Sequence, residues 1–195
     1  MLIPHRPSNQ VMIFDEHNDN KIFGLFEFIP FYSMTCDELN DMDFLVEFFH
    51  DHKSFVNSVS NFNSACLDDQ VCLYLSVEKI SKYIDRFTSV IQRGNQAGLI
   101  IGKSFKQIAN NSFQKNHDII VEHKMTDFGD PKLHTSEGNN FSAASLVSKM
   151  YNGFYNTPHK DKRDASEFAF VQLITTFSKT GKVSTHAQGF NVQGG

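Results

Sequence analysis

The spacing of apolar residues changes along this chain, and that change limits the folds open to it. Apolar residues recur every three or four positions up to about residue 113, which predicts amphipathic helices over residues 37–113. After Asn116 the apolar runs are short, aromatic and β-branched, as is typical of strands. Helices that come first and strands that come later favour an α+β domain over a parallel sheet with alternating helices.

Local signals predict where the elements begin and end. A helix is expected to begin after Thr35, because Glu38 follows it at the spacing of a capping box. A second helix is expected after Ser76 and is expected to stop at Gly94. A third helix is expected over residues 96–113. Two short N-terminal segments are expected to be strand or loop, at residues 12–14 and 21–29, and a later strand is expected at 118–121. Residues 126–140 are expected to form a loop. A hairpin is expected with strands at 167–177 and 182–192 and its turn at 178–181.

Length and charge narrow the class of protein. The 195 residues suit a single domain, with a mainly helical part over residues 1–116 and the first strands of a sheet over residues 117–195. The net charge of -4 argues against a general nucleic-acid coat protein, although a local basic surface is compatible with it.

The cysteines and the apolar runs indicate the compartment. The three cysteines form no CxxC motif, so a zinc ribbon or a disulfide framework is not expected, and a reducing compartment fits best. No apolar run approaches the roughly 20 residues of a membrane span, and the N-terminus has no signal-peptide core. The sequence therefore predicts a nuclear or cytoplasmic protein with no membrane partner.

His159 and Asp161 are the residues best suited to metal chemistry. They are two positions apart after Pro158, and alternate residues of an extended segment share a face, so both side chains can reach one ion. One His and one carboxylate make two-thirds of the facial triad that holds non-haem Fe(II), with a second His due from later in the chain. His186 is the only later histidine, but it lies on the expected second hairpin strand and is a poor candidate. No catalytic or co-substrate-binding residue is assigned.

Other patterns have simpler interpretations. A second His-x-Asp, at His17 and Asp19, is interpreted as a solvated turn. Residues 98–104 resemble a phosphate-binding loop, but three residues instead of four separate the glycines and no strand precedes them, so ATP binding is rejected. The other histidines that were considered as metal ligands are interpreted as surface residues: His50, His52, His117 and His123. The basic cluster is either a solvated loop or a contact for a phosphate backbone: Lys160, Lys162 and Arg163.

The stretch over residues 142–177 resembles a known family. The family is the TET/JBP-like 2-oxoglutarate and Fe(II)-dependent dioxygenases, particularly the fungal Tet-like branch, which is often transposon-associated. The residues that carry the resemblance are 145–147, 150–156, 158–161, 164–166 and 168–170.

This resemblance implies a fold and a chemistry. The implied fold is a partial double-stranded β-helix, or jelly roll, with an N-terminal helical region. The resemblance makes His159 and Asp161 the first two iron ligands and 2-oxoglutarate the co-substrate. The implied substrate is 5-methylcytosine or thymine in DNA, flipped out of the base stack. The family's second His and its basic partner for 2-oxoglutarate are not assignable, so a C-terminally truncated domain with little turnover is expected.

Two alternatives stay open. The chain can be such a dioxygenase domain. It can instead be a non-catalytic interaction module, or a degenerate transposon-associated fragment, and in either case it keeps part of the barrel. It can also be an unrelated α+β domain in which the His159 and Asp161 pattern is accidental. The sequence does not indicate the oligomeric state.

Overall fold

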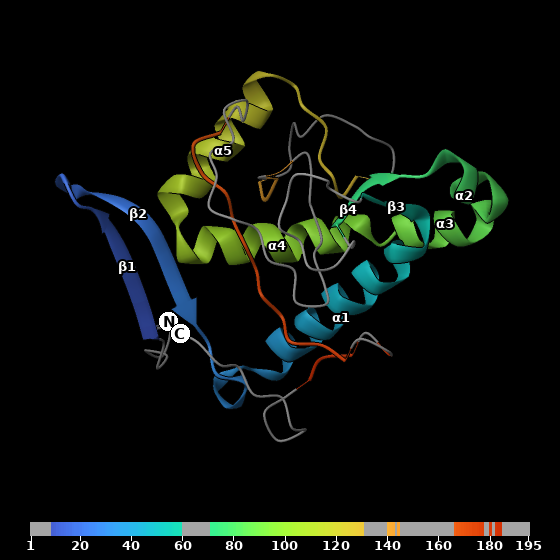
Figure 1. The fold of residues 1–195 in the computed structure, drawn as a ribbon, viewed down its shortest axis with the longest axis horizontal. Helices are drawn as coiled ribbons and strands as arrows, with labels where there is room; N and C mark the ends of the chain where they lie inside the picture. Colours follow the sequence, from blue (N-terminus) through green and yellow to red (C-terminus); the bar gives the residue numbers. More distant parts are fainter. Residues whose placement is uncertain are drawn as a thin grey trace.

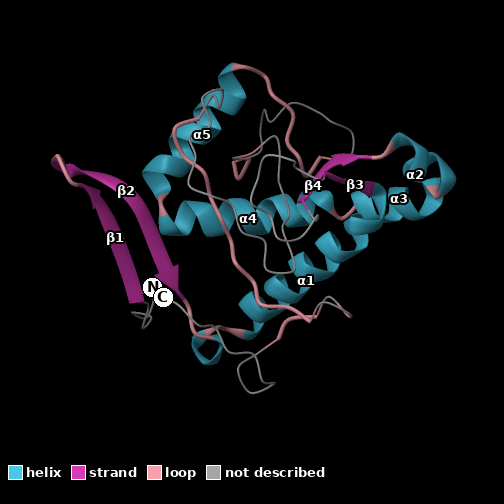
Figure 2. Cartoon of the chain, viewed as in Figure 1, coloured by secondary structure: helices cyan, strands magenta, loops and turns pink. Residues whose placement is uncertain are grey.

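The structure, a computed structural model, describes residues 9–59, 71–130, 140–142, 144, 166–177, 180 and 182–184. This part of the chain contains two small antiparallel hairpins; the N-terminal hairpin lies at the side of the helices, and the second hairpin lies among them (Figure 1, Figure 2). The mixture of helices with small antiparallel sheets confirms the predicted α+β class. No helix in the described ranges is both long enough and apolar enough to cross a membrane.

Helix α1, Cys36–His52, begins where the sequence predicted. The Thr35 hydroxyl accepts a hydrogen bond from the Glu38 N–H at 3.2 Å, and the Glu38 carboxylate accepts one from the Thr35 N–H at 2.8 Å. This reciprocal capping box satisfies two amides that a helix start leaves free. A short 3-10 turn, η1, precedes the cap at Phe31–Ser33.

A hairpin that the sequence did not predict follows α1 and the 3-10 turn η2, Lys53–Phe55. Its strands are β3, Val56–Val59, and β4, Val71–Leu75. Directly after β4, the Ser76 N–H donates to the Phe55 carbonyl at 2.7 Å. The Ser76 side chain then accepts from the Lys79 N–H and caps the next helix, as predicted.

The helix expected after Ser76 is divided into two. Helix α2 is Val77–Lys82 and helix α3 is Ile84–Ile91, with Tyr83 between them in a non-helical conformation. Gly94 was predicted to stop this segment, and that prediction was wrong, because Gly94 is the first residue of helix α4, Gly94–Ile108. A Cβ at Gly94 would lie 2.6 Å from the Gly129 carbonyl oxygen, so close backbone approach accounts for this glycine.

The third predicted helix also differs from the structure. It is divided at Ala109, whose φ of -146° and ψ of 68° are not helical, and continues as helix α5, Asn110–Glu122. Residues 118–121, predicted as a strand, are instead the end of α5. A short apolar run cannot distinguish a strand from a buried helical turn by its period alone. The Asp118 carboxylate accepts from the Gln114 amide one turn earlier at 2.8 Å, as only a helix allows.

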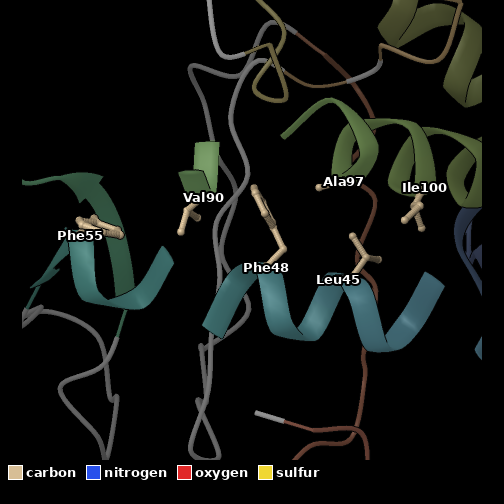
Figure 3. Packing of buried hydrophobic residues seen from close by; sticks show 6 residues of the cluster. All are labelled: Leu45, Phe48, Phe55, Val90, Ala97 and Ile100. Carbon is tan, nitrogen blue, oxygen red and sulfur yellow. The ribbon is translucent and has the colours of Figure 1, made fainter. Parts of the chain in front are cut away.

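The hydrophobic core lies between α1, α3 and α4 (Figure 3). Its buried members are Leu45, Phe48, Phe55, Val90, Ala97 and Ile100. In Figure 3, Leu45 and Phe48 of α1 face Ala97 and Ile100 of α4. Phenylalanine rings fill the remaining space edge to face, as Phe55 does against Phe87 with ring centroids 5.3 Å apart. The many phenylalanines thus supply the bulk of a core without tryptophan.

The two N-terminal apolar segments, for which the sequence allowed strand or loop, are paired strands of a hairpin. Strand β1, Asn9–Asp15, pairs antiparallel with β2, Asn18–Phe28. The turn between them contains His17, whose N–H donates to the Asp15 carboxylate at 3.0 Å. His17, the first residue of the His17 and Asp19 pattern, therefore lies in a hairpin turn, which agrees with the interpretation of this pattern as a solvated turn.

Residues 167–177 were predicted as a strand; no helix covers them, but only Thr176 is paired, through an isolated bridge, and residues 166–167 form a bend. Along residues 166–174 the side chains alternate between half-buried and exposed, which is the period of a strand. Thr176 then pairs antiparallel with Val183, and the Phe177 N–H donates to the Lys182 carbonyl at 2.9 Å. This is the start of the predicted hairpin. Its residues 185–192 lie outside the described ranges, and the jelly roll stays a prediction.

Candidate functional site

His159 and Asp161, the predicted metal ligands, lie outside the described residues, as do His186 and the basic cluster beside them. The structure describes the chain on both sides of residues 145–165, here called the ligand tract. The leading flank is residues 140–142 and 144, and the trailing flank is residues 166–174. The contacts of these flanks show how the ligand tract is attached to the helices.

Two hydrogen bonds hold the leading flank. The His117 Nδ1 atom of α5 lies 2.6 Å from the carbonyl oxygen of the buried Ser142. Because a carbonyl only accepts, His117 donates from Nδ1. Two residues later, the Ala144 carbonyl accepts from the Phe128 N–H at 3.3 Å. The backbone is therefore fixed directly before the ligand tract.

Helix α4 touches the leading flank at Gly102. A Cβ at Gly102 would overlap the Phe141 carbonyl oxygen and lie 2.9 Å from its carbonyl carbon. Gly94 and Gly98 precede it at intervals of four and so share its helix face. The glycines that resembled a phosphate-binding loop thus lie inside a helix, which confirms the rejection of ATP binding there. Their spacing serves close packing instead.

The trailing flank crosses α5, α4 and α1 in that order (Figure 1, orange to red). Its upper part is held by Asn116 of α5, whose side-chain amide donates to the Phe168 carbonyl at 3.0 Å. Next, the Phe170 ring stacks on Phe105 of α4, with centroids 5.1 Å apart and an interplanar angle of 11°. Both contacts use the half-buried, even-numbered residues of the alternating pattern.

The lower part of the trailing flank reaches the core. The Gln172 amide lies 3.1 Å from the Met42 sulfur of α1, and Ile174 packs against the core cluster. The opposite face of this segment is apolar and open: Val171 is 64% exposed and Leu173 92% exposed. One side of the extended segment is therefore covered by helices, and the other presents apolar side chains.

Consecutive residues of α5 hold the two flanks. Asn116 contacts the trailing flank and His117 contacts the leading flank, and we call this pair the α5 anchor. The two carbonyls that they hold, at Ser142 and Phe168, are 26 residues apart in sequence. The described chain on both sides of the ligand tract is thus attached to neighbouring residues of one helix.

The family of the chain follows from its sequence profile. The profile of the Tet-like 2OG-Fe(II) oxygenase superfamily matches residues 35–195. The chain belongs to this superfamily. The match begins at the N-cap of α1, so the matched region includes α1 to α5 and both flanks, whereas the β1–β2 hairpin and η1 precede it. No curated protein and no solved structure matches the chain.

Membership of the Tet-like superfamily implies Fe(II) and 2-oxoglutarate. Nowhere in the described ranges do three His, Cys, Asp or Glu side chains gather to hold a metal. His52 packs edge to face on Phe48 with centroids 4.6 Å apart, and Asp51 forms an ion pair with Arg93. His117 is committed to Ser142 through Nδ1. Within the described ranges, these three side chains are thus engaged with other protein groups.

The anchoring side chains keep spare hydrogen-bonding capacity. Asn116 Oδ1, Ser142 Oγ and Gln172 Oε1 are buried, and none has a hydrogen-bond partner among the described residues. An unsatisfied buried polar atom costs roughly 1–3 kcal/mol, so such atoms usually bind a backbone group or a water. All three lie on the contacts of the flanks, where the ligand tract enters and leaves.

A lysine cluster borders the same flanks, and sequence reasoning missed it. Lys103 lies over the Phe141 ring, 5.8 Å from its centroid, and Lys115 lies 5.2 Å from the Phe168 centroid. Lys106 lies over Phe141 as well, at 5.5 Å. The lysine cluster, Lys103, Lys106 and Lys115, was not recognisable from spacing, because its aromatic partners come from distant parts of the chain. Helix α4 carries two of these lysines and no acidic residue.

Proposed function

We propose that this Tet-like domain oxidises the methyl group of 5-methylcytosine or thymine in DNA. His159 and Asp161 would hold Fe(II), which together with bound 2-oxoglutarate supplies the oxidising power for the methyl carbon. The observation that carries the proposal is the superfamily match, which spans the His-x-Asp of the ligand tract.

The described residues would position these ligands and start the barrel. The α5 anchor holds both ends of the ligand tract, so the two ligands are presented from a backbone fixed on each side. The trailing flank is a suitable first strand for a jelly roll. Its open face carries Val171 and Leu173, and apolar side chains on the free side of a strand support a second sheet packed over them.

The charge distribution supports a nucleic-acid substrate. The whole chain is acidic, yet the lysine cluster lies beside both flanks, and the ligand tract carries three more basic residues. Phosphate contacts are made by such local groups of Lys and Arg, whatever the total charge. We therefore expect DNA to contact the lysine cluster beside the two flanks.

Metal binding tests the assignment of the ligands. Mn(II) is a redox-stable substitute for Fe(II), and its free-ion EPR signal falls when it binds to protein. His159→Ala and Asp161→Ala should each weaken Mn(II) binding at least tenfold. His17→Ala and Asp19→Ala are matched controls, because they alter the other His-x-Asp, and they should leave binding unchanged. Equal binding by all four variants and the unaltered chain would contradict the assignment.

Activity tests the substrate. Succinate release should be measured with Fe(II), 2-oxoglutarate and one of three DNA substrates. The first contains 5-methylcytosine and the second contains thymine. The third is the methyl-free control, with cytosine and uracil in place of these two bases. Release above background should require a methyl-bearing base and should be lost in His159→Ala. Only two protein ligands are assigned, so turnover by this chain is expected to be slow. Metal binding with no turnover on any DNA would favour the non-catalytic interaction module.

A further inference from the structure

Lys115 differs from the other two members of the lysine cluster, because a carboxylate lies beside it. Its Nζ atom is 3.7 Å from a carboxylate oxygen of Glu167, in addition to its position over the Phe168 ring. Within the described ranges, neither Lys103 nor Lys106 forms an ion pair with a carboxylate. One cation of the lysine cluster is therefore already paired with an acidic group of the protein itself.

Two interactions of different exposure join α5 to the trailing flank at this point. The buried Asn116, which follows Lys115, donates to the Phe168 carbonyl at 3.0 Å. The ion pair is open to solvent, because the Lys115 side chain is 63% exposed and the Glu167 side chain is 78% exposed. The ion pair can therefore separate while the hydrogen bond still holds the backbone of the trailing flank.

An exposed ion pair of this kind is easily exchanged for another. Such pairs contribute little stability, because both ions keep most of their water whether they are paired or apart. The phosphates of DNA carry condensed counterions, and a lysine that contacts a phosphate releases them, whereas contact with a single carboxylate gives no such release. At low salt concentration, a DNA phosphate is therefore a stronger partner for the exposed Lys115 ammonium than Glu167 is.

We propose that Glu167 competes with the phosphate backbone of DNA for Lys115 and thereby lowers the affinity of the Tet-like domain for DNA. This inference rests on the proposed DNA substrate and adds a residue that regulates its binding. In the free protein Lys115 is paired with Glu167, and in the complex a phosphate takes the place of the carboxylate. Phosphate contacts carry no sequence information, so Glu167 should lower the affinity for all DNA sequences alike.

Charge repulsion alone is the other way in which Glu167 can oppose DNA binding. A carboxylate near the binding surface repels a polyanion directly, and this effect does not require Lys115. Competition acts only through the lysine that the carboxylate contacts. The 3.7 Å contact between the two side chains favours competition, and removal of Lys115 separates the two effects.

A double-mutant cycle tests the competition directly. Fluorescence anisotropy should give the affinity of residues 1–195 for a labelled DNA duplex at about 50 mM salt, where phosphate contacts are strong. Glu167→Gln should bind DNA about two- to fivefold more tightly, in line with the free energy of an exposed ion pair. The same substitution in the Lys115→Ala background should leave the affinity unchanged. Circular dichroism verifies that each variant is folded.

Glu78→Gln is the matched control for net charge. Glu78 is exposed and lies on α2, away from the flanks, so its substitution removes one negative charge without altering the lysine cluster. This control should bind DNA as the unaltered chain does. An equal gain in affinity for Glu78→Gln and Glu167→Gln would overturn the proposal, because total charge would then explain both results.

The remaining outcomes distinguish the competition from the proposed function. The competition is overturned if Glu167→Gln leaves the affinity unchanged, or if it tightens binding equally with and without Lys115. If Lys103→Ala still weakens binding in that case, the DNA site stands and only the role of Glu167 is wrong. Failure of every variant to bind DNA would overturn the proposed substrate and the competition together.

Discussion

The side-chain amide of Asn116 lies 3.0 Å from the carbonyl oxygen of Phe168, 52 residues further along the chain. The next residue, His117, holds the Ser142 carbonyl at 2.6 Å. Through these two contacts, one turn of α5 fixes the backbone on both sides of the proposed metal ligands. We therefore expect α5 to contribute to function by holding the backbone on both sides of the proposed metal ligands. The free energy of these contacts can be measured.

Asn116→Leu should destabilise the domain more than a comparable change elsewhere on α5. It removes one donor to the Phe168 carbonyl, which keeps the Ser166 hydroxyl as a second donor at 2.9 Å, so the free energy of unfolding should fall by about 0.5–1.5 kcal/mol. Gln114→Leu is the control, because Gln114 makes a similar amide contact to Asp118 on the exposed side and should cost less than about 0.5 kcal/mol. Urea unfolding gives both values, and equal costs would show that the anchor does not stabilise the fold.

Gly102→Ala should be far more harmful than Gly98→Ala on the same helix. The new methyl group at residue 102 would overlap the Phe141 backbone, whereas at residue 98 it would lie 3.3 Å from the Asp127 carboxylate. Overpacking against backbone costs about 1–3 kcal/mol, and the better helix propensity of alanine offsets up to about 1 kcal/mol of the cost. Thermal unfolding should therefore show a clear loss for Gly102→Ala and little change for Gly98→Ala.

Contacts that are local in sequence were predictable, and long-range ones were not. The capping box at Thr35 and the cap at Ser76 depend on residues three positions apart, and both were found as expected. Among the predictions that failed are a helix stop at Gly94 and a strand at 118–121, and the first of these was decided by tertiary packing. Gly94 faces the backbone of Gly129, and no residue near it in sequence reports that approach.

The candidate site divides in the same way. His159 and Asp161 were chosen from their spacing and from a family resemblance, and the superfamily match supports the choice of family. Neither signal identified the supporting residues. The contacts of the α5 anchor join positions that are 25 and 52 residues apart in sequence. The lysine cluster likewise depends on rings from distant parts of the chain. Only the folded chain brings these positions together.

The stacked rings of Phe105 and Phe170 should be energetically coupled. A double-mutant cycle with Phe105→Leu and Phe170→Leu should give a coupling energy of about 0.5–1.5 kcal/mol, as expected for an aromatic pair. Phe113 also contacts Phe105, at 5.8 Å, but is not expected to couple to Phe170. Coupling near zero between Phe105 and Phe170 would indicate that the trailing flank does not lie on α4 in solution.

Lys103→Ala should weaken DNA binding and reduce its dependence on salt. Removing one phosphate contact should reduce the slope of log K against log salt concentration by about 1. Lys82→Ala is the matched control, because Lys82 is also an exposed lysine over an aromatic ring, 5.3 Å from the Tyr83 centroid, but lies on α2 away from the flanks. Fluorescence anisotropy at several salt concentrations measures the slopes. Equal slopes for the two variants would remove the lysine cluster from the DNA-binding surface.

Closure of the ligand tract has a thermodynamic consequence for the proposed metal. Bringing together two points 26 residues apart costs a free chain about 3 kcal/mol of entropy, and the contacts of Asn116 and His117 meet that cost when α5 folds. If His159 and Asp161 hold iron, as proposed, the affinity for iron and the packing of α5 should be linked through these contacts. A change that loosens α5 should then be measured as weaker metal binding.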